Sequence, residues 1–229
     1  MNYNPIIVAL DVETATEART IVQQIGPAAD FYKVGLELYT VAGMDLVKEL
    51  ANQGKHVFLD LKMYDISETV KRAAARVAAT NGIRFLTVHA SKAVVKAAVE
   101  AAAGSGLQIL AVTVLTSYDQ NDLNDLGYSC SVPELVAHLA AKAAEAGTHG
   151  LVCSPWEVAQ LRRTVGDEII LVTPGVRSPA AAAGDQKRVA TPAQAIQNGA
   201  SYLVMGRQIT RAAAPADEVK RVLEEIVTP

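Results

Sequence analysis

Two carboxylates and one ammonium fall within the short segment 60–65 (DLKMYD), directly after the apolar run 56–59 (HVFL). Alternate side chains of a β-strand share a face, so we expect Asp60 and Lys62 to point the same way, with Leu61 on the opposite side. Burying a charged group is costly unless the group is paired. The segment therefore predicts either a plain ion pair near a strand end or charges that are kept for chemistry.

Charged residues also stand at the ends of two neighbouring predicted strands. Asp11 follows the first strand, and Lys33 lies in the second. With Asp60 and Lys62 they form a quartet of alternating sign. Such a network holds each lysine ammonium rigidly, so that a proton can be delivered to one place. The quartet favours a functional cluster over a structural network of salt bridges.

A glycine and an arginine follow each of the last two predicted strands, Gly175 with Arg177 and Gly206 with Arg207. Glycine lets backbone N–H groups approach an anion, and arginine offers a forked pair of donors. Loops after these two strands form the common phosphate site of α/β barrels. An arginine at a helix start opposes the helix dipole, which favours a ligand role for Arg207.

Short β-branched apolar runs alternate with Ala-rich amphipathic stretches along the whole chain, which predicts alternating strands and helices. We expect strands at residues 6–10, 31–34, 57–61, 85–88, 109–115, 150–153, 169–172 and 202–205. We expect helices to begin near Glu13, Gly43, Ile66, Lys92, Val132, Pro155, Pro192 and Ala216. Pro155 and Pro192 each follow a capping Ser or Thr, a signal for a helix start.

This alternation predicts an α/β fold in which a single domain, residues 1–229, forms a (β/α)8 TIM barrel. No G-x-G-x-x-G or G-x-x-x-x-G-K-[ST] motif follows the first strand, where a dinucleotide-binding or P-loop sheet would carry it. Barrels carry their chemistry at the carboxyl ends of the strands. Two long connections, 116–132 and 174–191, are expected to be binding loops or lids, the alternative being idle loops.

The bulk composition excludes several classes of partner. Half of the 229 residues are hydrophobic, and 21 basic against 24 acidic residues give a net charge of −3 with no basic block. We therefore expect no nucleic-acid or membrane partner, although a few local cations can hold an anionic small molecule. The N-terminus has no signal-peptide pattern and no apolar run is long enough to span a membrane, so a cytoplasmic location is expected.

The cysteines and most histidines are not assigned to the site. Cys130 and Cys153 lack metal-type spacing and are expected to be free thiols. The histidines expected at the surface or at strand edges are His56, His138 and His149. His89 ends the fourth predicted strand, and its part in the site is left open.

A series of short, distinct sequence blocks lies along the chain, at 8–11 (VALD), 33–35 (KVG), 58–62 (FLDLK) with 65–66 (DI), 88–90 (VHA), 112–117 (VTVLTS), 152–154 (VCS), 172–177 (VTPGVR), 184–186 (GDQ) and 205–207 (MGR). In this order they resemble the orotidine 5′-phosphate decarboxylase family over essentially the whole chain. The D-x-K-x-x-D element alone is shared with sugar-phosphate decarboxylases and hexulose-phosphate synthases, but the ensemble is more specific.

The resemblance implies decarboxylation of orotidine 5′-monophosphate to uridine 5′-monophosphate without a metal or an organic cofactor. It implies that Lys62 donates the proton to C6 of the pyrimidine and that Asp60 stands against the carboxylate of the substrate. Lys33 and Asp65 would complete the alternating array.

The resemblance also implies a set of substrate ligands. Asp11 and Lys33 resemble the residues that bind the ribose hydroxyls, and Thr116 and Ser117 lie where the family contacts the pyrimidine. The residues that match the lid and phosphate ligands are Gln186, Arg177, Gly206 and Arg207.

A homodimer is a further implication, in which the second subunit lends Asp65 and Thr69 to the site. Two departures from the family pattern lie near these residues. Positions 63–64 are Met-Tyr where Phe-His is common, and 67–68 are Ser-Glu where Pro-Asn is common. None of the four belongs to the catalytic array, so they affect packing at the dimer edge, and the purpose of Glu68 is left open.

Two other functions fit a barrel of this kind. A Mg²⁺-dependent sugar-phosphate decarboxylase or aldolase would ligate the ion through Asp11, Asp60 and an acidic residue on the second strand. Relatives resembling that class carry Glu where this chain has Lys33, whose ammonium would repel the ion. A phosphate-binding barrel without enzymatic activity would need the arginine loops but neither Lys33 nor Lys62, so the intact array counts against it.

Overall fold

The computed structural model describes residues 4–179 and 190–227. Its strands are β1 (Ile6–Ala9), β2 (Phe31–Gly35), β3 (His56–Met63), β4 (Ile83–His89), β5 (Gln108–Val112), β6 (Gly150–Val152), β7 (Ile170–Pro174) and β8 (Tyr202–Met205). They are parallel and follow one another in sequence order around a closed barrel, in which β8 pairs with β1. The predicted (β/α)8 barrel is confirmed.

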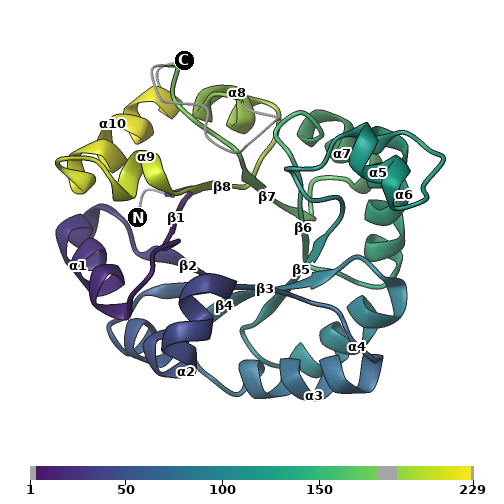
Figure 1. Cartoon of the computed structure of the whole chain (residues 1–229), viewed down its shortest axis with the longest axis horizontal. Helices are drawn as coiled ribbons and strands as arrows, with labels where there is room; N and C mark the ends of the chain where they lie inside the picture. The colour runs from purple at the N-terminus through teal and green to yellow at the C-terminus, as the bar shows by residue number, and fades with distance from the viewer. Residues whose placement is uncertain (1–3, 180–189, 228–229) are drawn as a thin grey trace.

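Helices surround the barrel on all sides, as Figure 1 shows. They are α1 (Ala15–Ile25), the 3₁₀ turn η1 (Gly26–Ala28), α2 (Leu36–Asn52), α3 (Ser67–Ala78), α4 (Lys92–Ala102), α5 (Gln120–Asp125), α6 (Val132–Glu145), α7 (Val158–Val165), α8 (Pro192–Gln197), α9 (Arg207–Thr210) and α10 (Pro215–Val227). None of these helices is both long enough and apolar enough to cross a membrane.

Apolar side chains fill the barrel interior below a charged upper layer. Phe31 and Lys33 share one face of β2, and Phe58 and Asp60 share one face of β3, so each charged residue follows an aromatic one toward the carboxyl end. The other members of this inner cluster are Ile7, Ala9, Phe85, Leu110, Val172, Tyr202 and Val204. The charged side chains of the array therefore lie directly above a layer of buried apolar side chains.

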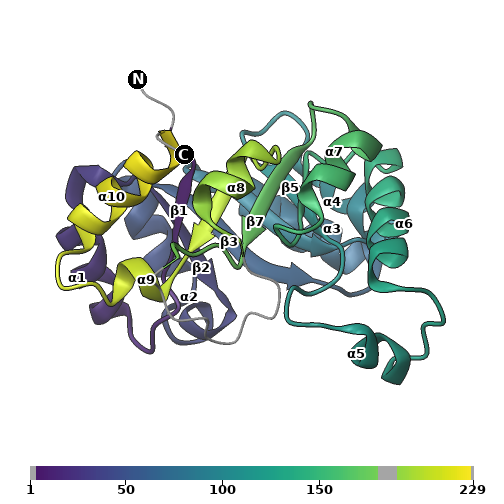
Figure 2. The same ribbon diagram turned by 90° about the horizontal axis from the view of Figure 1, so that it is seen from above.

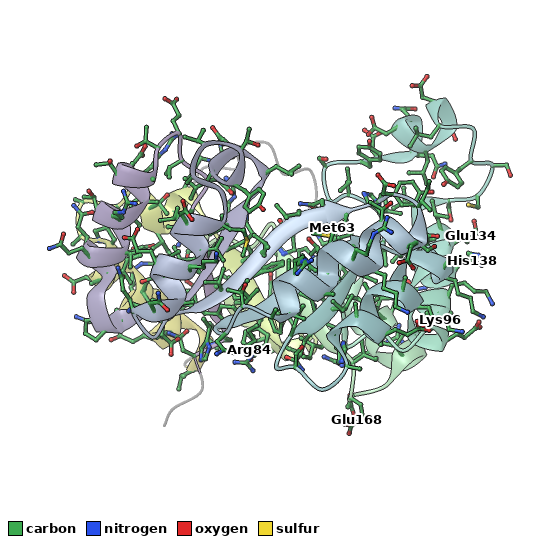
Figure 3. All side chains as sticks on the ribbon, turned by 90° about the horizontal axis from the view of Figure 1, so that it is seen from below. Met63, Arg84, Lys96, Glu134, His138 and Glu168 are labelled. Carbon is green, nitrogen blue, oxygen red and sulfur yellow. The ribbon has the colours of Figure 1, made fainter. Side chains whose placement is uncertain are left out.

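Arg84 covers the amino-terminal end of the inner cluster. The pairing of β3 with β4 shifts register beside it, and its guanidinium lies 5.6 Å from the ring centroids of Phe31 and Phe85 and 5.4 Å from that of Tyr202. Figure 3 places Arg84 at the edge of the barrel away from the long end of β3 that carries Met63. These cation–π contacts form a floor under the barrel.

A larger core lies between the outer face of the barrel and the helices. The amphipathic helix α3 buries Val70, Ala74 and Val77, which recur at three- and four-residue spacing, and α10 buries Val219 and Val222 in the same way. The hydrophobic periodicity of the sequence thus places each helix against the sheet.

Several predicted boundaries are wrong. The second helix begins at Leu36, well before Gly43, where a φ of 58° interrupts the helical backbone. The helix predicted at Pro155 begins at Val158, and β5 ends at Val112 rather than at residue 115.

Two short helices, α5 and α9, were not predicted. The helix α5 lies inside the long connection 116–132 and projects from the barrel, as Figure 2 shows. It begins with a capping box, in which Asp119 and Asp122 bond each other's backbone N–H groups. Neither helix is long enough to show a hydrophobic period in the sequence.

Candidate active site

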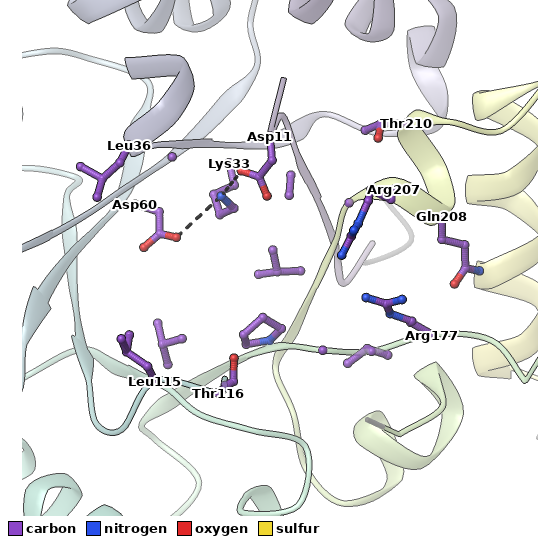
Figure 4. Close-up of a pocket in the computed structure, with 18 of the residues that line it drawn as sticks. Asp11, Lys33, Leu36, Asp60, Leu115, Thr116, Arg177, Arg207, Gln208 and Thr210 are labelled. Carbon is purple, nitrogen blue, oxygen red and sulfur yellow. Dashed lines mark hydrogen bonds and ion pairs between the residues drawn. The ribbon is translucent and has the colours of Figure 1, made fainter. Parts of the chain in front are cut away.

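The carboxyl ends of the strands open into a pocket of about 810 Å³. In Figure 4 its charged side chains point into one space from different walls. The predicted site residues that line it are Asp11, Lys33, Asp60, Lys62, Thr116, Arg177, Gly206 and Arg207. The pocket is where a barrel of this class carries its chemistry.

Asp60 is the centre of the charged array. Its Oδ2 accepts a hydrogen bond of 2.9 Å from Lys62 Nζ and lies 3.7 Å from Lys33 Nζ. Lys33 Nζ in turn donates to Asp11 Oδ1 at 2.7 Å. The structure therefore brings the four residues of the predicted quartet into one connected chain of alternating charge.

The Asp60 carboxyl is ionised although it is buried. Burial alone raises the pKa of this carboxyl, because the charged form loses solvation. The charges of Lys33 and Lys62, with hydrogen bonds from Lys62 and Thr87, outweigh that effect and hold the pKa below its ordinary value of 3.8. The pocket wall thus carries a fixed anion between two cations.

A bulge in β3 brings Lys62 into the array. Residues 60–62 of β3 stand opposite the single residue Thr87 of β4. Lys62 has a φ of 48°, in the left-handed region of backbone conformation that residues other than glycine rarely adopt. The expected shared direction of Asp60 and Lys62 is therefore produced by the bulge and not by regular strand alternation, and Leu61 packs outward against the larger core.

Thr87 is a site residue that the sequence reasoning missed. Its side chain is fully buried, and its hydroxyl donates to Asp60 Oδ1 at 2.9 Å while accepting the Lys62 backbone N–H at 2.9 Å. It shares the inner face of β4 with Phe85. That alternation is the signal in the sequence, but threonine is common in strands, so the residue type alone does not mark it as functional.

Gly35 leaves room for the pair between Lys33 and Asp11. A Cβ atom added at Gly35 would lie 2.8 Å from Lys33 Nζ and 3.2 Å from Asp11 Oδ1. The Lys33 side chain is 9% exposed, whereas that of Asp11 is 55% exposed. The array thus runs from a buried centre to a solvent-facing end.

Arg177 and Arg207 line the same pocket, and Figure 4 shows both side chains on a wall away from Asp60. Gly175 has a φ of 77°, which glycine adopts without strain, and it lets the loop after β7 turn into the pocket. Gly206 precedes Arg207 at the start of α9. Two convergent guanidinium groups are suited to a phosphate dianion.

The remaining predicted residues are not brought into the pocket. Asp65 is exposed, and its Oδ1 accepts the backbone N–H of Ile66 at 2.6 Å. Thr69 and Ser117 are exposed and do not line the pocket. Gln186 lies outside the described residues. Asp65 and Thr69 were expected to act across a dimer interface, which one chain does not test.

The pocket also has lining residues that the sequence reasoning missed. They are the α9 residues Gln208 and Thr210 and the following Arg211. Arg211 stands one helical turn after Arg207, so it adds a third arginine to this wall. Because the helix α9 was not predicted, the sequence did not indicate that Arg207 and Arg211 lie on the same wall.

His89 lies at the edge of the array. Its ring packs against Tyr64, with centroids 5.3 Å apart. Burial, and then the charge of Lys62, lower the pKa of His89 from 6.5, so the imidazole is neutral at pH 7. His138 is exposed on α6 (Figure 3), and His149 Nδ1 accepts a backbone N–H of β5 at 3.0 Å, which confirms these two as surface and strand-edge residues.

Within residues 4–179 and 190–227, no group of three or more His, Cys, Asp or Glu side chains is arranged to hold a metal ion. Cys130 and Cys153 are not joined in a disulfide. The carboxylates of the pocket are paired with Lys33 and Lys62. The donor set of this pocket therefore suits an organic anion better than a divalent cation.

Comparison with known proteins finds one family model, described as the orotidine 5′-phosphate decarboxylase / HUMPS family, which matches residues 4–222. An orotidine 5′-phosphate decarboxylase of Rhodopseudomonas palustris (strain BisB5) is 50% identical over 96% of this chain and 94% of its own length. One of Bradyrhizobium sp. (strain ORS 278) is 48% identical over 97% of this chain and 91% of its own.

A solved structure gives the same result. The crystal structure of orotidine 5′-phosphate decarboxylase from Lactobacillus acidophilus superposes with a TM-score of 0.86 at 38% identity, covering 98% of this chain and 99% of that one. The similarity therefore extends over the whole barrel and is not confined to the charged segment of β3.

Proposed function

Because this chain belongs to the orotidine 5′-phosphate decarboxylase / HUMPS family, we propose that it converts orotidine 5′-monophosphate to uridine 5′-monophosphate and CO2 in pyrimidine biosynthesis. The observation that carries the proposal is a single pocket with an alternating lysine–aspartate array on one wall and an arginine pair on another. The arginines suit the phosphate of the nucleotide, and the array suits the departing carboxylate.

Binding is anchored at the phosphate. Arg177 and Arg207 hold the dianion with the backbone of Gly206, and Asp11 and Lys33 bind the ribose hydroxyls. The pyrimidine lies toward Thr116, which lines the pocket, and Gln186 is a further ligand by its match to the family pattern. This placement directs the C6 carboxylate of the substrate at Asp60 and Lys62. The separation between the arginine wall and the lysine–aspartate wall determines where the pyrimidine lies once the phosphate is bound.

The chemical step breaks the bond between C6 and the carboxyl carbon. Its electron pair stays on C6 while CO2 leaves. The Lys62 ammonium stabilises this carbanionic charge and then transfers a proton from Nζ to C6, after which Lys62 takes a proton from solvent. A cation fixed where negative charge develops lowers the barrier because it stabilises the transition state more than the bound substrate.

Asp60 contributes through its charge. Its low pKa keeps it ionised, so it repels the carboxylate of the substrate, and that repulsion ends when CO2 leaves. It also holds the Lys62 ammonium at 2.9 Å and so fixes the proton donor in place. This chemistry requires neither a metal nor an organic cofactor.

We further propose that the protein acts as a cytoplasmic homodimer. Two large apolar side chains of the β3–α3 loop, Tyr64 and Ile66, are 70% and 76% exposed. Exposed apolar clusters of this kind mark interaction surfaces. They flank Asp65 and precede Thr69, so a second subunit that docked on this surface would contact the segment that carries both polar residues.

The test is to mix the protein with orotidine 5′-monophosphate and to follow the loss of ultraviolet absorbance. We expect turnover by the wild type, nearly complete loss of turnover in Lys62→Ala with nucleotide binding still detectable, and full activity in Lys142→Ala. Lys142 is an exposed α6 lysine paired with Glu145, so it controls for loss of a charge elsewhere. A Lys62→Ala variant that kept a tenth of the activity would remove Lys62 from the proton-donor role.

The Mg²⁺-dependent sugar-phosphate decarboxylase or aldolase remains the alternative on the same fold. Lys33 Nζ lies 2.7 Å from Asp11 and 3.7 Å from Asp60, the two carboxylates that such an ion would need. An ammonium at that place opposes a divalent cation. Activity that persists unchanged in excess EDTA supports the proposal, and activity restored only by added Mg²⁺ contradicts it.

A further inference from the structure

Ser178 and Gln208 directly follow Arg177 and Arg207 in the chain, and their side chains are joined at the pocket wall, where Gln208 is a lining residue and Ser178 is buried. Gln208 Oε1 accepts the Ser178 backbone N–H at 3.1 Å, and Gln208 Nε2 donates to Ser178 Oγ at 2.8 Å. The segments after β7 and β8 are therefore linked at two points, one residue beyond each arginine. Figure 4 draws Gln208 on the same side of the pocket as Arg177 and Arg207, and all three line it.

The C-terminal helix α10 anchors this link from outside the barrel. Arg221 Nη2 donates to Ser178 Oγ at 2.8 Å, and the Ser178 hydroxyl donates to Glu225 Oε2 at 2.6 Å. The second hydrogen of Gln208 Nε2 goes to Glu218 Oε1 at 2.8 Å. Ser178 Oγ thus accepts two hydrogen bonds and donates one, which is its full capacity.

Arg221 ties the two glutamates together. It contacts Glu218 Oε1 at 2.7 Å and Glu225 Oε2 at 3.4 Å. Ser178 is 5% exposed, and the Glu218 and Glu225 side chains are 19% and 20% exposed. A sheltered network in which each member is oriented by two partners holds one geometry, and removing a member leaves the others unsatisfied.

Two guanidinium groups that bind one dianion must be held at a spacing that lets both reach it. A loop that let them separate would have to bring them together again on binding, and that ordering lowers affinity. A scaffold that fixes their backbones beforehand avoids this loss. Through the Gln208 side chain, which bonds both the backbone N–H and the hydroxyl of Ser178, the link joins the two arginine-bearing segments, so it is placed to supply such a scaffold.

We propose that Gln208 and Ser178, held by Arg221, are positioning residues that fix Arg177 and Arg207 at the spacing of one phosphate dianion. The inference rests on the proposed function, in which these arginines bind the phosphate of the nucleotide. It assigns α10 a part in substrate binding although that helix lies outside the pocket.

The experiment compares the dissociation constants of uridine 5′-monophosphate and uridine by titration calorimetry, with orotidine 5′-monophosphate turnover measured alongside. The variants are Gln208→Met, which keeps the length of the side chain without its hydrogen bonds, and Ser178→Ala. Lys220→Met is the matched control, because Lys220 is an exposed α10 residue that pairs with Asp217 at 3.0 Å outside the network. Arg221→Lys and Arg221→Met test whether a retained donor restores part of the effect.

We expect Gln208→Met to weaken binding of the nucleotide by about tenfold, which corresponds to about 1.4 kcal/mol, and binding of uridine by less than about twofold. In turnover the KM should rise more than kcat falls. Ser178→Ala should act in the same direction, Arg221→Lys should retain more affinity than Arg221→Met, and Lys220→Met should match the wild type.

Several outcomes overturn the inference. They are an equal loss of nucleotide and uridine affinity, unchanged nucleotide affinity in both Gln208→Met and Ser178→Ala, and a wild type that binds the nucleotide no more tightly than uridine. Failure of the proposed function is separate from these. If the wild type failed to decarboxylate the substrate, the proposed activity would be refuted. If Gln208→Met nevertheless lost the preference for the nucleotide over uridine that the wild type shows, the positioning role would still be supported.

Discussion

Thr87 on β4 donates a hydrogen bond of 2.9 Å to Oδ1 of Asp60 on β3. The same hydroxyl oxygen accepts the backbone N–H of Lys62, which stands in the left-handed region at a φ of 48°. One buried side chain therefore orients the anion of the array and supports the backbone that carries its cation. The bulge and the array are held by the same contact.

The first prediction concerns this contact. Thr87→Val keeps the shape of the side chain but leaves Asp60 with one hydrogen bond fewer and the Lys62 N–H unpaired, at a cost to stability of about 1–3 kcal/mol. Because the proton donor is then less well fixed, we expect kcat to fall by about tenfold or more. Steady-state turnover and chemical denaturation measure the two effects.

Thr148→Val is the control for this prediction. Thr148 is also buried and donates to backbone carbonyls at 2.9–3.0 Å, but at the amino end of β6, away from the pocket. It should lose stability while keeping kcat, and Thr87→Ser should recover much of the activity. Equal kcat values in Thr87→Val and Thr148→Val would contradict the assigned role of Thr87.

The second prediction concerns Gly35→Ala. The new methyl group would stand 2.8 Å from Lys33 Nζ, so the flexible lysine must move away from Asp11 while the backbone stays in place. We expect a small change in melting temperature and a fall in kcat/KM of about tenfold or more, since ribose contacts and the alternating charge are both disturbed. A variant with normal kcat/KM would show that the pair between Lys33 and Asp11 is dispensable.

The third prediction compares Arg207→Ala with Arg211→Ala. Both arginines line the pocket wall, but Arg207 is the one assigned to the phosphate. Loss of a charge-assisted contact to a dianion should lower kcat/KM by about a hundredfold for Arg207→Ala, with a smaller loss for Arg211→Ala. An unchanged kcat/KM in Arg207→Ala would remove this residue from the phosphate site.

The fourth prediction concerns pH. The folded protein holds the pKa of His89 below its ordinary value of 6.5, so between these two values the unfolded chain binds more protons than the folded one. The stability that neutral His89 supports is complete above pH 6.5 and is lost as the pH falls through the folded pKa. Urea denaturation between pH 7.5 and pH 5 should therefore show a smaller loss for His89→Gln than for the wild type.

The matched control for the pH experiment is His138→Gln, which changes an exposed histidine on α6. Its stability should follow the wild-type curve. If His89→Gln lost stability toward low pH as steeply as His138→Gln, then burial of His89 beside Lys62 would not be coupled to folding.

The barrel and most of the charged array were predictable because they follow from local rules. Strand alternation and a position at a strand end were enough to group Asp11, Lys33 and Asp60. Lys62 was also predicted to join the array, but from regular strand alternation, whereas in the structure a bulge in β3 brings it there. The register of two strands decides such a contact, and one strand's sequence does not reveal that register.

The parts that were missed depend on contacts between distant segments. Gln208 and Ser178 are ordinary polar residues in the sequence, and only the approach of β7, α9 and α10 makes them partners. The helix α9 itself is too short to show a period. Positioning residues of this kind are visible only when the tertiary arrangement is known.

The aromatic layer that Arg84 covers at the amino-terminal end of the barrel limits the paths by which molecules reach the pocket. In the part of the chain that the structure describes, this packed layer closes the amino-terminal end, so the pocket opens toward the carboxyl ends of the strands. On the proposed function, CO2 and uridine 5′-monophosphate must therefore leave through the same opening by which the substrate enters. Each catalytic cycle then ends with the release of two products along one path, so the order of product release is part of the turnover.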